Sequence, residues 1–177
     1  MNERTCRVAN ASKLDAPERR IWLPPEEVIG LLKVQPGQQV ADIGAGTGYF
    51  SVPLAGIVGP EGKVWAVDGQ QGMLDLLQKK LKEPGAPRNI VCQLGSAART
   101  GVPAGSCDVA LLANIWHELD RHADVLREVA RILRQRGRLA ILDWRKDCAP
   151  PPGPPVEHRI SSGDASALLA SQGWRIT

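Results

Sequence analysis

Three glycines alternate with other residues directly after a short apolar run. Gly44, Gly46 and Gly48 enclose Ala45 and Thr47. Without Cβ atoms, glycine backbones turn sharply and can approach a ligand closely. The helix expected to follow would direct its unpaired N–H groups toward a carboxylate or phosphate held there. The loop therefore predicts a site for a nucleoside cofactor, and by itself it fits a dinucleotide as well as other adenosyl groups.

The glycine spacing and two nearby carboxylates favour an adenosyl group other than a dinucleotide. A dinucleotide loop of the form G-x-G-x-x-G would have its third glycine at position 49, where the chain has Tyr49. Asp42 immediately precedes the loop, where it would attract an ammonium group and repel a pyrophosphate. Asp68 ends the next apolar run, and a carboxylate at that position accepts hydrogen bonds from ribose hydroxyls. We predict an adenosyl site with Asp68 on the ribose.

Short apolar runs alternate with helical patterns along the chain, which predicts an α/β fold with a doubly wound, Rossmann-like parallel sheet. Gly137 is interpreted as the stop of the helix expected at residues 121–134, and residues 173–177 as the start of a sixth strand. Residues 1–23 are polar and predict an irregular N-terminal arm, a candidate lid, before a single domain over residues 24–177. Strands are expected at 39–43, 63–67, 90–94, 108–113 and 138–142, and helices at 24–32, 49–58, 72–81, 121–134 and 164–172.

Four segments resemble the motifs of class I S-adenosylmethionine-dependent methyltransferases. They are similar to the small-molecule branch that contains the ubiquinone/menaquinone methyltransferases, and the resemblance covers about residues 20–175. The segments are Val40–Phe50, Val64–Asp68 with Gly72-Met73-Leu74, Asp108–Ala113 with Trp116–Leu119, and Gly137–Trp144.

This resemblance implies S-adenosylmethionine as the cofactor and the strand order 3-2-1-4-5, with the family's C-terminal strands shortened or missing. It implies that Asp42 holds the amino group of the cofactor and that Asp68 holds the ribose. Ser96 stands where the family has an acid for the adenine amino group. The other residues implied at the cofactor are Gly44, Ala45, Gly46 and Gly48 along the methionine part, Gly69 beside the adenosine, and Asn114 at the mouth of the site.

His117 is the candidate general base, because histidine titrates near neutral pH and this one follows the fourth strand. A packed histidine or one that caps a helix is the alternative. His117-Glu118 and His122 do not form the zinc motif H-E-x-x-H, because the second histidine comes five residues after the first, about 140° further around a helix. The four cysteines form no Cys-x-x-Cys pair, and we expect no metal site.

The formal charge of +3 is close to balance and favours a small-molecule acceptor over nucleic acid. The arginines at 127, 131, 134, 136 and 138 are interpreted as a solvated helix face and the turn after it. Residues 113–116 read Ala-Asn-Ile-Trp and lack the [DN]-P-P-[YFW] motif of nucleic-acid amino-methyltransferases. We expect no membrane span, no signal peptide and a cytoplasmic protein. A non-catalytic adenosyl-binding module and a nicotinamide oxidoreductase remain alternatives.

The fifth strand would be an apolar sheet edge, which proteins usually cover. Either the stub at residues 174–177 pairs there, or a second copy of the chain does and forms a homodimer.

Overall fold

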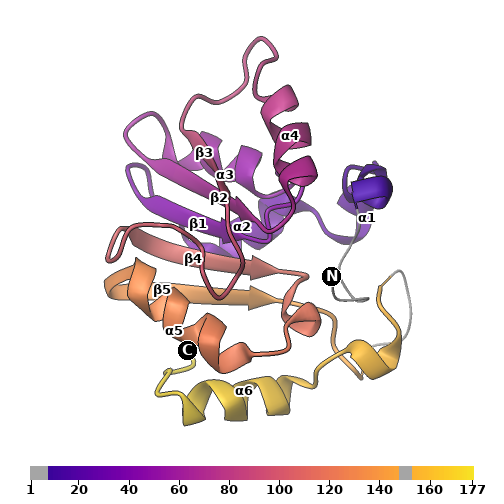
Figure 1. Ribbon diagram of the computed structural model, residues 1–177, viewed down its shortest axis with the longest axis vertical. Coiled ribbons are helices and arrows are strands. Elements are labelled where there is room, and N and C mark those ends of the chain that lie inside the picture. The colour runs from indigo at the N-terminus through magenta and orange to yellow at the C-terminus, as the bar shows by residue number, and fades with distance from the viewer. Residues whose placement is uncertain (1–7, 148–152) are drawn as a thin grey trace.

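The computed structural model describes residues 8–147 and 153–177 and shows a parallel sheet between two layers of helices (Figure 1). Cys6 and Cys148 lie outside the described residues. The strands are β1 (Gln39–Ile43), β2 (Lys63–Asp68), β3 (Ile90–Leu94), β4 (Cys107–Ala113) and β5 (Leu133–Leu142). The helices are α1 (Arg19–Trp22), α2 (Pro25–Leu32), α3 (Ser51–Val58), α4 (Gln71–Lys80), α5 (His122–Ile132) and α6 (Ser162–Ser171), with 3-10 turns η1 (Val8–Leu14), η2 (Trp116–Glu118) and η3 (Val156–His158).

The predicted sheet is confirmed. The described residues form five strands in the order β3-β2-β1-β4-β5, and every neighbouring pair is parallel. The order of neighbours reverses at β1, the first strand, and the next strands are added on either side of it. Ligands bind at such a switch point, beyond the carboxyl ends of the strands.

Residues of the central strands alternate between two hydrophobic cores, as side chains of period two must. Val40, Val64 and Leu111 pack in a core with α2 and α3, whereas Ala41 and Leu112 pack in a second core with α5. Leu77 of α4 joins a smaller cluster on the α3 side. Both faces of the sheet are therefore covered, which explains why the strands are almost continuously apolar.

The interpretation of Gly137 as a helix stop is wrong. Helix α5 ends at Ile132, and Leu133 is already extended, with φ −73° and ψ 142°. Leu133 pairs with Cys107, and the ladder resumes only when Arg138 pairs with Val109, across an irregularity in the register. The left-handed residue in between is Arg136, with φ 66°. Burial of Leu133 in the second core pulls the chain into the sheet without a glycine cap.

The predicted sixth strand is also wrong, since residues 174–177 take no regular structure. Gly173 has φ +80°, and the Trp174 N–H donates to the Leu169 carbonyl at 3.0 Å. A left-handed glycine with such a bond ends a helix, so Gly173 terminates α6 instead of opening a strand. Trp174 packs against the second core beside Leu168 and Leu169. The stub is therefore not paired with β5.

The N-terminal arm is not irregular where the structure describes it. It forms η1 and α1, and in Figure 1 these elements lie near the carboxyl ends of the strands. Trp22 packs on Trp144, just after β5, with ring centroids 5.1 Å apart. Over residues 8–147 and 153–177, no helix has both the length and the hydrophobicity needed to cross a bilayer.

Candidate active site

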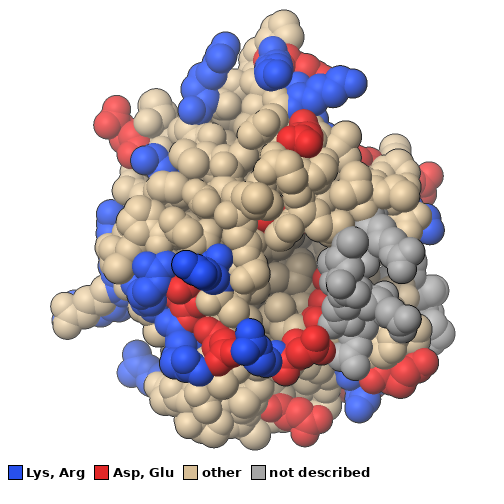
Figure 2. Space-filling view, in the orientation of Figure 1, with Lys and Arg blue, Asp and Glu red and all other residues tan. Residues whose placement is uncertain are grey.

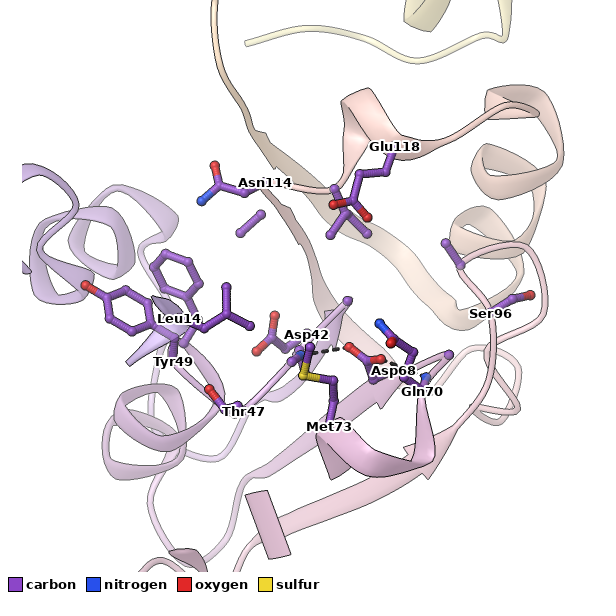
Figure 3. Close-up of a pocket in the computed structure, with 18 of the residues that line it drawn as sticks. Leu14, Asp42, Thr47, Tyr49, Asp68, Gln70, Met73, Ser96, Asn114 and Glu118 are labelled. Carbon is purple, nitrogen blue, oxygen red and sulfur yellow. Dashed lines mark hydrogen bonds between the residues drawn. The ribbon is translucent and has the colours of Figure 1, made fainter. Parts of the chain in front are cut away.

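A cavity of about 260 Å³ lies at the carboxyl ends of β1, β2 and β4. The space-filling view shows a hollow in the middle of this face, with uncharged side chains above it and charged side chains below it (Figure 2). Figure 3 places Asn114 and Glu118 across the cavity from Asp42 and Asp68. The lining residues are Leu14, Arg19, Asp42, Gly44, Ala45, Gly46, Thr47, Tyr49, Phe50, Asp68, Gly69, Gln70, Met73, Gly95, Ser96, Ala97, Ala113, Asn114, Ile115, Glu118 and Leu119.

The glycine loop is held against the neighbouring strand. The N–H groups of Gly44 and Ala45 both donate to the Val67 carbonyl, at 2.8 and 2.9 Å. Gly44 has φ +78°, and a Cβ built there would lie 2.6 Å from Cγ2 of Ile115. Any side chain at this position would meet the loop after β4. At Gly44 the loop therefore lines the cavity with backbone alone.

Gly48, also expected along the methionine part, lies on the side of the loop that faces α4. It does not line the cavity, and a Cβ on it would lie 2.4 Å from Cδ1 of Leu77, in α4. Its φ is +86°. The third glycine lets the loop pack on α4, behind the part of the cavity wall formed by Gly44, Ala45, Gly46 and Thr47.

Asp68 braces the glycine loop from the end of β2. Its Oδ2 accepts a hydrogen bond from the Gly46 N–H at 2.8 Å, and its Oδ1 accepts one from the Gln70 N–H at 2.9 Å (Figure 3). Burial raises its pKa, and the backbone N–H groups oppose that shift. A carboxylate has about four lone-pair sites, so each oxygen can accept a further bond from a ligand hydroxyl.

Asp42 is the most deeply buried acid of the cavity, with 2% of its surface exposed. Its Oδ2 accepts a hydrogen bond from Ser51 Oγ at 2.5 Å. Desolvation raises the pKa of Asp42 from 3.8 to about 6; the Ser51 hydroxyl and the charge of Arg19 lower it, and the charge of Asp68 raises it. Such a carboxylate favours a ligand that brings a positive charge, because that charge would offset the cost of burial.

The remaining residues expected at the cofactor also line the cavity. Gly69 follows Asp68, and Ser96 lies on the loop after β3. Asn114 takes the left-handed conformation, with φ 58°, and its N–H donates to the Leu142 carbonyl at 2.8 Å. Asparagine tolerates this conformation better than most residues, and the resulting bend directs the chain across the mouth of the cavity.

His117 is not among the cavity-lining residues. It is 7% exposed, and its Nδ1 lies 2.7 Å from Oδ1 of Asp143, at the end of β5. The His117 N–H also donates to Asp143, at 3.1 Å. In a 3-10 turn, successive side chains point about 120° apart. Consequently Glu118 lines the cavity while its neighbour His117 is held by Asp143.

The cavity also contains residues that the sequence analysis did not assign to the cofactor. Leu14 and Arg19 come from the N-terminal arm, and Met73 comes from α4. Trp116, in contrast, is buried against His122, with ring centroids 4.3 Å apart, and does not line the cavity. No local pattern marks the arm residues, because only the fold brings them to the glycine loop.

Most of the arginine run is engaged in ion pairs. Arg127 pairs with Asp124, Arg131 with Glu128 and Arg134 with Asp108. The bonds from Arg131 and Thr100 hold the pKa of Glu128 down at about 2. Figure 2 shows positive and negative side chains interspersed beside the hollow. Within residues 8–147 and 153–177, no three histidine, cysteine, aspartate or glutamate side chains are grouped as metal ligands.

Comparison with known families matches residues 41–141 to the methyltransferase domain, more than half of the 177 residues. The chain belongs to this methyltransferase family. The crystal structure of an S-adenosylmethionine-dependent methyltransferase from Aquifex aeolicus has a TM-score of 0.91 and 29% identity, covering 98% of this chain and 91% of that chain. The predicted class I S-adenosylmethionine-dependent methyltransferase fold and its cofactor are confirmed.

Curated relatives of this methyltransferase are longer proteins. The ubiquinone/menaquinone biosynthesis C-methyltransferase UbiE of Ectopseudomonas mendocina is 30% identical over 158 residues, which are 89% of this chain and 59% of that protein. The demethylmenaquinone methyltransferase of Listeria welshimeri is 32% identical over 118 residues, which are 67% of this chain and 50% of that protein. The chain thus spans roughly half to three fifths of their length.

Proposed function

We propose that this methyltransferase domain transfers a methyl group from S-adenosylmethionine to a small-molecule acceptor. The observation that carries the proposal is that Asp42 and Asp68 line one cavity together with the glycine loop that runs between them in the sequence. Asp42 would hold the ammonium group and Asp68 the ribose hydroxyls. Gly44, Ala45 and Gly46 would follow the methionine part, Gly69 and Ser96 would lie along the adenosine, and Asn114 would bound the sulfonium end.

When bound, the cofactor supplies an electrophilic methyl group for an in-line displacement. The protein contributes mainly orientation and exclusion of water. Phe50 and Ile115 give the cavity apolar walls, whereas Asn114 and Glu118 offer polar groups on the side facing the acids of β1 and β2. An acceptor that carries a proton would also need a base. The role of His117 as that base stays a prediction, with Asp143 positioning its ring.

The names of the two relatives suggest quinone precursors as the first acceptors to test. Calorimetry with S-adenosylhomocysteine and with NAD tests the cofactor, and transfer of label from methyl-labelled S-adenosylmethionine to an acceptor panel tests the reaction. Tighter binding of NAD would contradict the proposal. Binding of S-adenosylhomocysteine without turnover on any acceptor would favour the non-catalytic adenosyl-binding module, which the position of His117 outside the cavity also favours.

We further propose that residues 1–23 act as a lid on a domain formed by residues 24–177. Oδ1 of Asp15 accepts hydrogen bonds from Thr47 Oγ1 at 2.9 Å and from Lys80 Nζ at 2.7 Å. Lys80 also donates to the Thr47 carbonyl, at 2.9 Å. These bonds fasten the arm to the glycine loop and to α4. A Cβ on Gly46 would lie only 3.1 Å from Leu14, so the arm packs directly over the loop.

Replacing Asp15 with alanine should loosen the lid, because it removes both bonds to the glycine loop and α4. We expect binding of S-adenosylhomocysteine to weaken by about three- to tenfold, the loss of one or two hydrogen bonds. Limited proteolysis should cut the arm faster. Glu18→Ala is the matched control, an exposed acid of the same arm. Equal affinities for the two variants would contradict the lid.

Cytoplasmic location, the absence of a nucleic-acid partner and the homodimer through the β5 edge remain predictions. The described cysteines, Cys92 and Cys107, are free thiols, as a reducing compartment favours. Because the C-terminal stub does not pair with β5, a second copy of the chain is the occupant we propose for that edge. Sedimentation that finds a monomer at every concentration would contradict the dimer.

A further inference from the structure

Arg19 combines two properties that seldom occur together. It lines the cofactor cavity, and only 8% of its surface is exposed. A guanidinium stays charged at any physiological pH, and burying it is costly unless anions or hydrogen-bond acceptors compensate. Its neighbour Arg20, by contrast, has 58% of its side chain exposed and pairs with Glu26 on the surface. The two adjacent arginines therefore differ in environment: Arg19 is buried at the cavity, and Arg20 is exposed on the surface.

Contacts within the arm and the loop fix the position of the Arg19 guanidinium. Its Nη1 donates to the Leu14 carbonyl at 2.9 Å, and its central carbon lies 4.0 Å from the centroid of the Tyr49 ring. The Tyr49 hydroxyl in turn donates to the Leu23 carbonyl at 2.5 Å. Leu14 and Tyr49 lie together on one side of the cavity in Figure 3, near Asp42. The guanidinium is therefore held at the glycine-loop wall of the cavity.

Asp42 provides the complementary charge on the same wall. The charge of Arg19 lowers the pKa of the Asp42 carboxyl, so the two groups interact electrostatically. An α-amino acid presents an ammonium and a carboxylate on one carbon, and a fixed acid and a fixed base on one wall match that pair. A planar guanidinium can also bind a carboxylate with two parallel hydrogen bonds.

Resting on the function proposed above, we propose that Arg19 binds the carboxylate of the cofactor's methionyl part while Asp42 binds its ammonium group. An acidic acceptor is the competing ligand for Arg19. The position of Arg19 favours the cofactor, because it lies beside the loop that follows the methionine part. Asn114 and Glu118 face the cavity from the opposite side (Figure 3). The arm would thus supply a cofactor ligand as well as a cover.

The test compares two ligands that differ only in the carboxylate. S-adenosylhomocysteine has both charged groups, and its decarboxylated analogue keeps the ammonium and loses the carboxylate. Calorimetry on the wild-type chain should show the analogue binding at least about tenfold more weakly. In Arg19→Gln this preference should fall to about twofold or less, with the affinity for the analogue itself unchanged. Arg20→Gln, the matched control, should keep the wild-type preference.

Several results would overturn the inference. Equal weakening of both ligands in Arg19→Gln would mean that Arg19 only holds the arm in place. Unchanged binding of S-adenosylhomocysteine together with a raised KM for an acceptor would assign Arg19 to the acceptor. A wild-type chain that binds S-adenosylhomocysteine but does not discriminate between the two ligands would exclude the carboxylate site without any variant. A wild-type chain that binds neither ligand would contradict the proposed function itself, and this inference with it.

Arg19→Lys keeps the charge, and it covers the case in which Arg19→Gln does not fold. Lysine offers a point charge without the planar fork, so we expect a preference between those of the wild type and Arg19→Gln. A full wild-type preference in Arg19→Lys would show that only the charge is needed. Loss of all preference in this variant, with the affinity for the analogue unchanged, would show that the fork itself is required. A preference unaffected by both substitutions would contradict the site.

Discussion

Asp68→Ala is expected to weaken the binding of S-adenosylhomocysteine by about 1–3 kcal/mol, the worth of hydrogen bonds from ribose hydroxyls to a charged acceptor. The structure adds a second reason for the loss. The same carboxylate accepts bonds from the N–H groups of Gly46 and Gln70, so its removal also frees the glycine loop. Calorimetry on the folded variant measures the change.

A ligand that lacks the hydroxyls separates these two effects of Asp68. The wild-type chain should prefer S-adenosylhomocysteine to its 2′,3′-dideoxy analogue, and Asp68→Ala should lose most of that preference. Asp75→Ala, an exposed acid on α4, removes the same charge without touching the cavity. If Asp68→Ala keeps the full preference for the hydroxyls, the ribose assignment is wrong.

Asp42→Asn is expected to stabilise the unliganded protein and to weaken cofactor binding. Burial raises the pKa of Asp42 from 3.8 to about 6, so ionising it at pH 7 costs the folded state about 3 kcal/mol, at about 1.4 kcal/mol for each pH unit. Asparagine has the same shape and can still accept the hydrogen bond from Ser51. It carries no charge for the ammonium group, and we expect affinity to fall by roughly 10- to 100-fold.

The stability difference between the wild type and Asp42→Asn should depend on pH. Between about pH 4 and 6 the folded state keeps a proton on Asp42 that the unfolded chain has released. The free energy of unfolding of the wild type should therefore fall, relative to Asp42→Asn, as the pH rises through that window, and the difference should be constant above it. Urea unfolding of both proteins at pH 4, 5, 6 and 7 measures the difference directly.

Cofactor binding should follow the opposite trend, because an ammonium ligand favours the ionised carboxyl. The affinity of the wild type for S-adenosylhomocysteine should rise with pH up to about 6 and level off above it, and that of Asp42→Asn should lack this rise. An equal pH dependence for the two proteins would remove Asp42 from the ammonium site. A less stable Asp42→Asn would show that the charge of Asp42 is compensated in the unliganded fold.

The sequence was sufficient where function depends on neighbours within one β-α-β unit. Asp42 and Asp68 lie at the carboxyl ends of consecutive strands and the glycine loop follows the first of them, and parallel pairing brings the ends of such strands together whatever the rest of the chain does. The alternation of apolar runs and helical patterns also predicted the α/β fold correctly. The spacing of apolar residues in a helix or strand depends on local backbone geometry and not on distant contacts.

Only the tertiary structure decided the roles that depend on contacts between distant segments. Leu14 and Arg19 reach the cavity because the arm packs on the glycine loop. Gly48 has to be a glycine because Leu77 of α4 occupies the space that a Cβ would need. His117 and Glu118 are adjacent in sequence, yet Asp143 holds one while the other faces the cavity. Gly173 ends α6, and the partly buried Trp174 after it packs against the second core. In each case a residue type allowed two roles, and packing against a partner far along the chain selected one.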